Sequence, residues 1–371
     1  MIEQNHVIIT GIPGYPRNSD KYNSMSNQRY RSMDLLRAAA ILLVILAHTI
    51  LSYGAPAYLA PWQLGGTGVD LFFVLSGWLL GCQLFKEAAT SGRIDIKKFW
   101  IRRWMRTLPA YYVVLIPSIF QRYLTKDNID FPWEYFVFIQ NYDYPLHFFS
   151  ISWSLCVEEQ FYLLIAPLLA FLTLLNKKNT TALLILLLIA PYCFRELGWY
   201  SHPNETHVRI DSCVAGVFLA HIHYQYRDLW NKLSAYAVPL MIISIMLYAS
   251  YFVARYNPHM GIHDPNNLVL ALIFGIWVMA ANADNSWRRF LYIPGAYHIA
   301  TRSYALYLLH PEVLALMKRL LIDVPFVVYL IMSLAGSLIL SEILYRLVEK
   351  PIMDVREKHR FSSSSNYGKA T

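Results

Sequence analysis

The feature that most constrains how this chain folds is a succession of apolar segments, several of them long enough to cross a lipid bilayer. Hydrophobic residues make up 56% of the 371 residues and charged residues only 15%, whereas a water-soluble protein carries roughly 25% charged residues. A membrane-spanning helix needs about 18 or more mostly apolar residues. We therefore predict an all-α, polytopic membrane protein of about ten transmembrane helices. The predicted spans are 33–53, 68–86, 106–121, 151–175, 180–194, 209–224, 235–254, 267–283, 301–318 and 324–347.

The distribution of positive charge predicts the orientation of the chain. If the N-terminus is cytoplasmic, the inner segments hold 23 of the 32 Lys and Arg residues and the outer loops hold 7. Because Lys and Arg are enriched in cytoplasmic loops, both termini are predicted to be cytoplasmic. Residues 1–32 then form a polar cytoplasmic tail and residues 33–351 the transmembrane domain. Residues 352–371 form a second cytoplasmic tail, with the composition of a disordered segment.

Composition also argues against several classes of function. The formal net charge is +8, but the basic residues sit beside membrane segments, so no nucleic-acid partner is expected. The four cysteines include no CxxC pair, which argues against a metal site. No internal repeat is evident, which argues against an inverted-repeat transporter. The expected surroundings are membrane lipids, and no tightly bound cofactor is predicted.

The first predicted span carries a pair of ionisable residues. An ionisable side chain at the bilayer centre costs at least about 2.5 kcal/mol, so it usually faces a cavity or a partner. Arg37 and His48 are eleven residues apart, which puts them on one helix face about 16 Å apart along the axis. A buried neutral histidine can act as a general base or a nucleophile. The alternative is a structural histidine with an arginine that extends to the interface.

Carboxylates and arginines near two other spans are further candidates. Glu158 and Glu159 lie about two turns inside the fourth span and point about 100° apart, so they face different partners. Arg103 and Arg106 lie one turn apart at the inner end of the third span. Arginines at this spacing suit a phosphate group, and they also suit a simple anchor at the cytoplasmic face.

Three residues are predicted to bind substrate: Asp70 at the outer end of the second span, Trp153 at the start of the fourth, and His310 within the ninth. Asp70 is alternatively a helix cap, and His310 is alternatively structural. The segment from Tyr345 to Pro351, which closes the last span, is predicted to be a helix stop with a salt-bridged anchor.

Seven segments together are more specific than any single residue. They occur in this order between residues 33 and 351: MDLLRAAAILLVILAH, GVDLFFVLSGWLL, RRWMRTLPAYY, SWSLCVEEQFYLL, RIDSCVAG, SYALYLLHP and YRLVEKP. The chain thereby resembles the acyltransferase-3 family of integral membrane O-acyltransferases. Cys156 stands where a serine is common in that family, and Trp78 where a smaller aromatic is common.

This resemblance implies ten helices, an acyl-CoA co-substrate, commonly acetyl-CoA, and a hydroxyl acceptor. The acceptors are usually surface polysaccharides, lipid-linked sugars or peptidoglycan, which implies the bacterial inner membrane. Some relatives carry an extracytoplasmic hydrolase-like domain. Only about 24 residues follow the last span, so we expect no such fused domain here. Any second extracytoplasmic protein that completes the transfer would be a separate partner.

The resemblance also assigns roles to residues. The arginine–histidine signature of the family falls on Arg37 and His48, its arginine pair on Arg103 and Arg106, and its Trp-Ser…Val-Glu-Glu motif on Trp153, Ser154, Glu158 and Glu159. The three arginines are predicted to bind the CoA phosphates. His48 is predicted to be a base or an acyl carrier, oriented by Glu158 or Glu159. The alternative function is a transporter or flippase for a lipid-linked sugar or an acidic solute, because proton relays use the same residue types.

Overall fold

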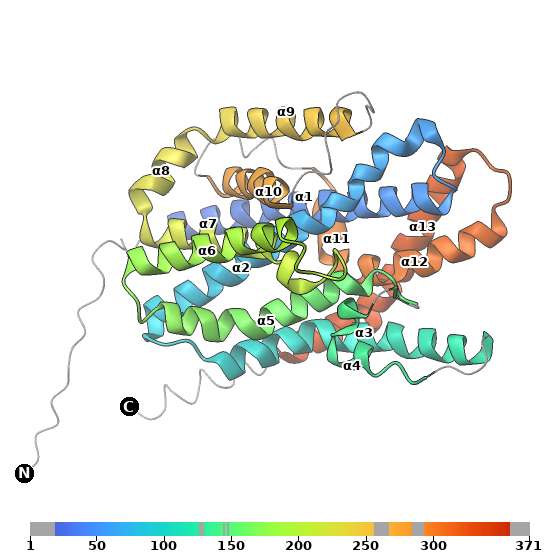
Figure 1. Cartoon of the computed structure of the whole chain (residues 1–371), viewed down its shortest axis with the longest axis horizontal. Coiled ribbons are helices and arrows are strands. Elements are labelled where there is room, and N and C mark those ends of the chain that lie inside the picture. Colours follow the sequence, from blue (N-terminus) through green and yellow to red (C-terminus); the bar gives the residue numbers. More distant parts are fainter. Residues whose placement is uncertain are drawn as a thin grey trace, which may run out of the picture.

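The computed structural model describes residues 19–125, 130–143, 145–146, 148–255, 267–283 and 293–356. Side chains are described from Arg31 onward in these ranges, apart from residues 252–255. Every regular element among the described residues is a helix (Figure 1), so the all-α prediction is confirmed. Residues 1–18 and 357–371, most of the two predicted tails, lie outside the described residues.

Most of the long helices run side by side along the long axis of the molecule (Figure 1). The elements are α1 (Ser19–Ser52), η1 (Ala57–Thr67), α2 (Gly68–Ser91), α3 (Ile96–Thr125), α4 (Glu134–Val137), η2 (Gln140–Tyr142), α5 (Ser152–Leu172), α6 (Lys177–Glu196), η3 (Thr206–Val208), α7 (Asp211–Gln225), α8 (Arg227–Ala235), α9 (Ala237–Arg255), α10 (Asn267–Asn282), α11 (Ala296–Thr301), α12 (Ser303–Leu320), α13 (Phe326–Leu344) and η5 (Tyr345–Glu349).

Each of the ten predicted apolar segments falls on a helix, namely α1, α2, α3, α5, α6, α7, α9, α10, α12 and α13. Four helical stretches among the described residues are both long and apolar enough to cross a membrane: Arg31–Ser52, Ala57–Ser91, Ser152–Leu172 and Phe326–Arg356. A fifth arises if α8 and α9, which meet at a bend of 69°, form one broken span. The chain is therefore a multi-pass helical membrane protein, while ten spans and cytoplasmic termini stay predictions.

The helices α2 and α7 pack in the same direction with their backbones in close contact. A Cβ atom added to Gly77 in α2 would collide with the carbonyl oxygen of Cys213, and one added to Gly216 in α7 would collide with the carbonyl oxygen of Val74. Small residues are what allow two helices to approach so closely in a membrane. This contact brings the start of α7 beside Asp70, near the start of α2.

The end of the last long helix differs from the prediction. The segment from Tyr345 to Pro351 is not a helix stop, because the helix continues through Pro351 to Arg356. It passes through a single π-helical turn, in which the N–H of Lys350 bonds to the carbonyl oxygen of Tyr345. Proline inside a helix lacks an N–H and crowds the preceding turn. The wider π-helical turn just before Pro351 accommodates the missing N–H and the crowding by the proline ring.

The α2–α7 contact gives a first testable prediction. Replacing Gly77 with Ala should lower the free energy of unfolding by about 1–3 kcal/mol, because the new methyl group overpacks a backbone contact. The measurement is thermal unfolding of the purified protein in detergent. Gly275→Ala in α10 is the matched control, since its added Cβ would meet only the Leu219 side chain at an ordinary 3.5 Å. Equal midpoints for the two variants would contradict the close contact.

Candidate active site

The site is organised around two histidines from helices α1 and α12. His48 Nδ1 lies 2.8 Å from His310 Nε2, and the two rings are nearly coplanar, at 12° with centroids 5.0 Å apart. His310 is fully buried, and His48 is half-buried. These residues are separated by 262 positions in the sequence. The structure therefore joins a predicted catalytic residue to a predicted substrate-binding residue.

The hydrogen bonds of this pair specify which nitrogen carries each proton. His310 Nδ1 lies 3.1 Å from the carbonyl oxygen of Leu306, and the carbonyl of Tyr307 also interacts with that side chain. Pro311 has no N–H to occupy the Tyr307 carbonyl. Because carbonyl oxygens only accept, His310 Nδ1 must be the protonated nitrogen and Nε2 an acceptor in the neutral ring. His48 Nδ1 then donates to His310, which leaves the lone pair of His48 on Nε2.

Three arginines lie together toward the other end of α1. Arg37, Arg103 and Arg106, here called the arginine cluster, are close enough for their charges to repel one another. Arg37 also lies 3.7 Å from Asp34 in an ion pair. The guanidinium of Arg103 lies 4.4 Å from the centre of the Tyr162 ring. The structure thus brings all three predicted phosphate-binding residues into one place, from helices α1 and α3.

The cluster is a mixed network of charges, with carboxylates around the guanidiniums. Glu158 faces Arg103 and Arg106, and Glu349 from the π-helical turn faces Arg106. The Nε atom of Arg103 is buried without a hydrogen-bond partner among the described residues, and the Arg106 side chain is exposed. The exposed guanidinium of Arg106 therefore keeps N–H groups that an anionic ligand can take up.

The two adjacent carboxylates of α5 have different partners. Glu158 accepts hydrogen bonds from Ser76 at 2.9 Å and from Tyr162 at 3.0 Å. Glu159 is buried near Thr107 of α3, and its Oε2 atom has no hydrogen-bond partner among the described residues. Neither of these contacts involves His48. The sequence analysis expected one of these carboxylates to orient His48, but in the structure that position is occupied by His310.

Asp70 and Trp153 meet at a second polar centre, through an arginine. Asp70 is buried and lies 3.2 Å from the Arg209 guanidinium, with the Ser212 hydroxyl donating to it at 3.4 Å. The same guanidinium lies 5.0 Å from the centre of the Trp153 ring. Two predicted substrate-binding residues are thus together, and the third, His310, is with His48. The carboxylate of Asp70 forms an ion pair with Arg209, so Asp70 is not simply a helix cap.

Sequence reasoning missed several members of the site. Arg209 pairs with Asp70, while Ser76 and Tyr162 hold Glu158. Arg209 belongs to the RIDSCVAG segment, and Tyr162 lies one helical turn after Glu158 in the SWSLCVEEQFYLL segment. The i,i+4 spacing of Glu158 and Tyr162 was the one local signal available. Within the described residues, no group of three or more His, Cys, Asp or Glu side chains is arranged as a metal site.

Comparison of the sequence with known proteins gives the family of the chain. The family described as an acyltransferase domain matches residues 30–346, nearly the whole membrane bundle. The chain therefore belongs to the acyltransferase-3 family, whose members transfer acyl groups. No solved structure matches the chain.

Named relatives are consistent with this family. A Staphylococcus aureus protein provisionally named an O-acetyltransferase is 29% identical over 364 residues, which is 89% of this chain and 58% of that protein. The peptidoglycan O-acetyltransferase OatA of Listeria monocytogenes is 28% identical, covering 86% of this chain and 55% of its own length. The O-acetyltransferase OatA of Staphylococcus aureus is also 28% identical, covering 90% and 58%. The chain thus spans little more than half the length of these relatives.

The buried Asp70–Arg209 pair gives a second prediction. Replacing Asp70 with Ala should destabilise the protein by about 3–5 kcal/mol, because it leaves a guanidinium buried and uncompensated. The measurement is thermal unfolding in detergent. Arg346→Gln is the control, since Arg346 also pairs with a carboxylate, that of Glu342, but its side chain is 71% exposed. A drop in the midpoint no larger for Asp70→Ala than for Arg346→Gln would contradict this assignment.

Proposed function

We propose that this chain is an O-acetyltransferase of the bacterial inner membrane that moves an acetyl group from acetyl-CoA to a hydroxyl of a cell-surface glycan or lipid-linked sugar. The observation that carries the proposal is the His48–His310 pair, whose hydrogen bonds leave an unprotonated nitrogen on His48. Such a nitrogen suits acyl transfer, which needs either a base for the hydroxyl or a nucleophile for the thioester. The family and the names of the relatives support the same reaction class.

The donor would bind with its phosphates on the arginine cluster. Guanidiniums donate two parallel hydrogen bonds to a phosphate, and the carboxylates of the network hold the guanidinium planes in place. Arg37 and His48 are eleven residues apart on α1, so a ligand that bridges them is elongated, about 16 Å along the helix. The pantetheine arm of CoA joins phosphates to a thioester in this way. The thioester would then lie near His48.

The simplest route uses His48 as a general base. His48 Nε2 takes the proton of the acceptor hydroxyl as its oxygen attacks the thioester carbonyl carbon. The tetrahedral intermediate collapses with cleavage of the carbon–sulfur bond, and the imidazolium returns the proton to the leaving sulfur. The products are the acetyl ester and free CoA. His310 keeps the imidazole in the required tautomer by accepting the Nδ1 proton, the role that an aspartate has in other systems.

The second route uses the same nitrogen as a nucleophile. His48 Nε2 attacks the thioester carbonyl carbon, CoA leaves as its thiolate, and an acetyl-imidazolium that keeps its Nδ1 proton remains on the protein. The acceptor oxygen then attacks the acetyl carbon, its proton passes to the released Nε2, and from there to the CoA thiolate. The routes differ in one observable. Labelled acetyl-CoA given without any acceptor should leave label on the protein, at His48, only in the second route.

The central prediction concerns His48. Wild-type protein given acetyl-CoA and a glycan acceptor should release free CoA, and His48→Ala should lower that rate by roughly 100-fold or more, as loss of a positioned acid–base group does. The measurement is thiol release by the purified protein in detergent. His298→Ala is the control, since His298 is an exposed histidine that contacts Glu342. Equal rates in wild type and His48→Ala would overturn the proposal, as would a wild type that consumes no thioester, which is the behaviour of a transporter.

The role of His310 can be separated from folding by a pair of variants. His310→Gln keeps an oxygen that can accept from His48 Nδ1, whereas His310→Leu removes every acceptor at that position. We expect partial activity in His310→Gln and little in His310→Leu. Both variants should retain their donor KM, because His310 lies away from the arginine cluster. Equal loss in the two variants would show that His310 acts only through packing.

A further prediction tests the donor site with a matched pair of ligands. Arg106→Gln should raise the KM for acetyl-CoA about 10- to 100-fold with little change in kcat, because a charge-assisted contact worth about 1.5–3 kcal/mol is lost in binding. Wild type should bind acetyl-3′-dephospho-CoA more weakly than acetyl-CoA. The arginine variant that has lost the contact with the 3′-phosphate should bind the two donors equally well. Arg102→Gln, at the neighbouring position, is the control. An unchanged donor KM in Arg106→Gln and Arg103→Gln would contradict the assignment.

A further inference from the structure

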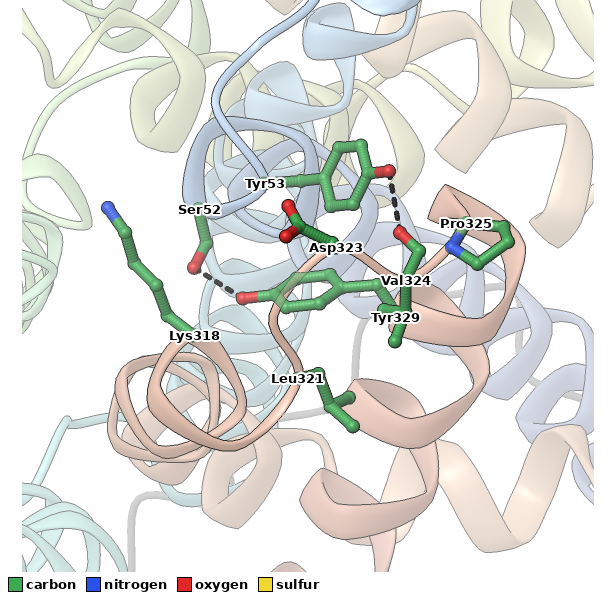
Figure 2. A pocket seen from close by; sticks show the side chains of 8 residues that line it. All are labelled: Ser52, Tyr53, Lys318, Leu321, Asp323, Val324, Pro325 and Tyr329. Carbon is green, nitrogen blue, oxygen red and sulfur yellow. Dashed lines mark hydrogen bonds between the residues drawn. The ribbon is translucent and has the colours of Figure 1, made fainter.

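An open polar cleft lies beyond the histidine pair, at the end of α1 farthest from the arginine cluster. It has a volume of about 620 Å³, within the range of roughly 300–1,000 Å³ that is typical of small-molecule sites. Figure 2 shows its residues, which come from the end of α1, the end of α12, the turn that follows it and the start of α13. They are Ser52, Tyr53, Lys318, Leu321, Asp323, Val324, Pro325 and Tyr329.

The cleft begins one helical turn after His48 on α1, at Ser52, and two turns after His310 on α12, at Lys318. Ser52 follows His48 by four residues on α1, a rise of about 6 Å on nearly the same face. Its hydroxyl lies 2.8 Å from the Tyr329 hydroxyl and 3.5 Å from the carbonyl oxygen of Leu314. Leu314 in turn follows His310 by four residues on α12. The floor of the cleft is therefore built on the same two helices, and the same faces, as the reacting nitrogen.

The walls of the cleft are aromatic and held rigidly. The rings of Tyr53 and Tyr329 lie 5.3 Å apart at 51°, and Phe326 packs edge-on against Tyr53, also at 5.3 Å. The Tyr53 hydroxyl donates to the carbonyl oxygen of Val324 at 2.8 Å, while that of Tyr329 is bonded to Ser52 (Figure 2). The phenol groups thus fix the turn. Tyr329 is only 2% exposed, so the half-buried Tyr53 is the aromatic ring that the cleft can offer to a ligand.

Two opposite charges stand at the rim. Lys318 and Asp323 both line the cleft and are exposed. A carboxylate accepts several hydrogen bonds and an ammonium donates three. Asp323 also holds a left-handed backbone conformation, with φ of 55°, which Asp and Asn tolerate better than most residues. One partly exposed aromatic ring, that of Tyr53, beside one acceptor and one donor group suits a glycosyl unit, which presents apolar C–H faces and many hydroxyls.

We propose that this cleft is the acceptor subsite and that it binds one glycosyl unit, with a hydroxyl directed toward His48. This inference rests on the proposed function, because it assigns the second substrate of the same reaction. It places the two substrates on opposite sides of His48 along α1, with the donor phosphates at the arginine cluster near the middle of the helix and the acceptor sugar beyond its end. The charge distribution of the sequence predicts that this end of α1 faces outward, where cell-surface glycans lie.

The test measures glycan binding directly, without acetyl-CoA. The probe is a soluble peptidoglycan disaccharide titrated into the full chain in lipid nanodiscs by calorimetry, beside the same disaccharide on a short prenyl pyrophosphate. Asp323→Asn keeps the tolerance for the left-handed backbone while it removes the charge. We expect this variant to weaken binding of both probes about 10-fold, the cost of one charge-assisted hydrogen bond. Tighter binding of the prenyl pyrophosphate form by wild type would identify the lipid-linked source.

A second pair of variants tests the cleft by filling it. Leu321→Trp places a large side chain at a position that lines the cleft, whereas Ile322→Trp does so at a neighbouring residue that is 73% exposed and does not line it. Only Leu321→Trp should abolish binding of the disaccharide and raise the acceptor KM, with the KM for acetyl-CoA unchanged in both variants. Unaltered binding in both Asp323→Asn and Leu321→Trp would overturn the proposal, and so would a wild type that binds neither probe.

Failure of this inference can be told apart from failure of the proposed function. One outcome is that the protein releases CoA in a His48-dependent reaction while its acceptor KM is unchanged in Asp323→Asn and Leu321→Trp. That result would reject the cleft as the acceptor subsite and leave the acyltransferase function standing. Glycan binding that depends on the cleft, in a protein that releases no CoA, would remove the acyltransferase reaction and leave the binding site.

Discussion

A polar side chain within a bilayer has to find its partner inside the protein, because the surrounding hydrocarbon offers none. In this chain the partners come from segments far apart in the sequence. Asp70 pairs with Arg209, Ser76 donates to Glu158, and His48 bonds to His310. Each pair fixes how one helix is rotated against another, since a different rotation would leave a buried group unpaired. The interactions that hold the bundle together are therefore also the ones that aim the reactive groups.

Helix α1 orders these groups along its axis. Arg37, His48 and Ser52 occupy successive levels of one helix, at a rise of 1.5 Å per residue. The level of Arg37 belongs to the arginine cluster, the level of His48 to the histidine pair, and the level of Ser52 to the cleft. In the proposed arrangement, the rise of the helix sets the length of donor that reaches from the arginine cluster to His48. The two proposed substrates would then approach His48 from opposite directions without competing for the same space.

The sequence predicted what is local, and it did not predict what depends on packing between helices. The apolar segments and the shared face of Arg37 and His48 follow from helix periodicity within one segment, and the structure places helices at all of those segments. The approach of Arg37 to Arg103 and Arg106 was expected only through the family resemblance. The partner of His48 could not be derived, because nothing within α1 specifies which face of α12 it meets. Similarly, the Asp70–Arg209 pair depends on close packing between the small residues of α2 and α7. The sequence of either helix alone does not show how far along the other helix it packs.

The sequence analysis predicted His310 as a substrate-binding residue but not as the partner of His48, and that pairing has a physical origin that bears on the proposed reaction. An aspartate or glutamate beside His48 would place a full negative charge next to the reacting nitrogen, and inside a bilayer such a charge is costly when the histidine is neutral. A second neutral imidazole orients the first at no such cost. When His48 gains a proton during the reaction, the bond from its Nδ1 to His310 Nε2 becomes charge-assisted and strengthens. The Leu306 carbonyl, which accepts from His310 Nδ1 at 3.1 Å, extends that stabilisation by a second dipole. In the proposed reaction the pair would thus carry a positive charge only while the acyl group is moving, which is the condition that a buried site in a membrane favours.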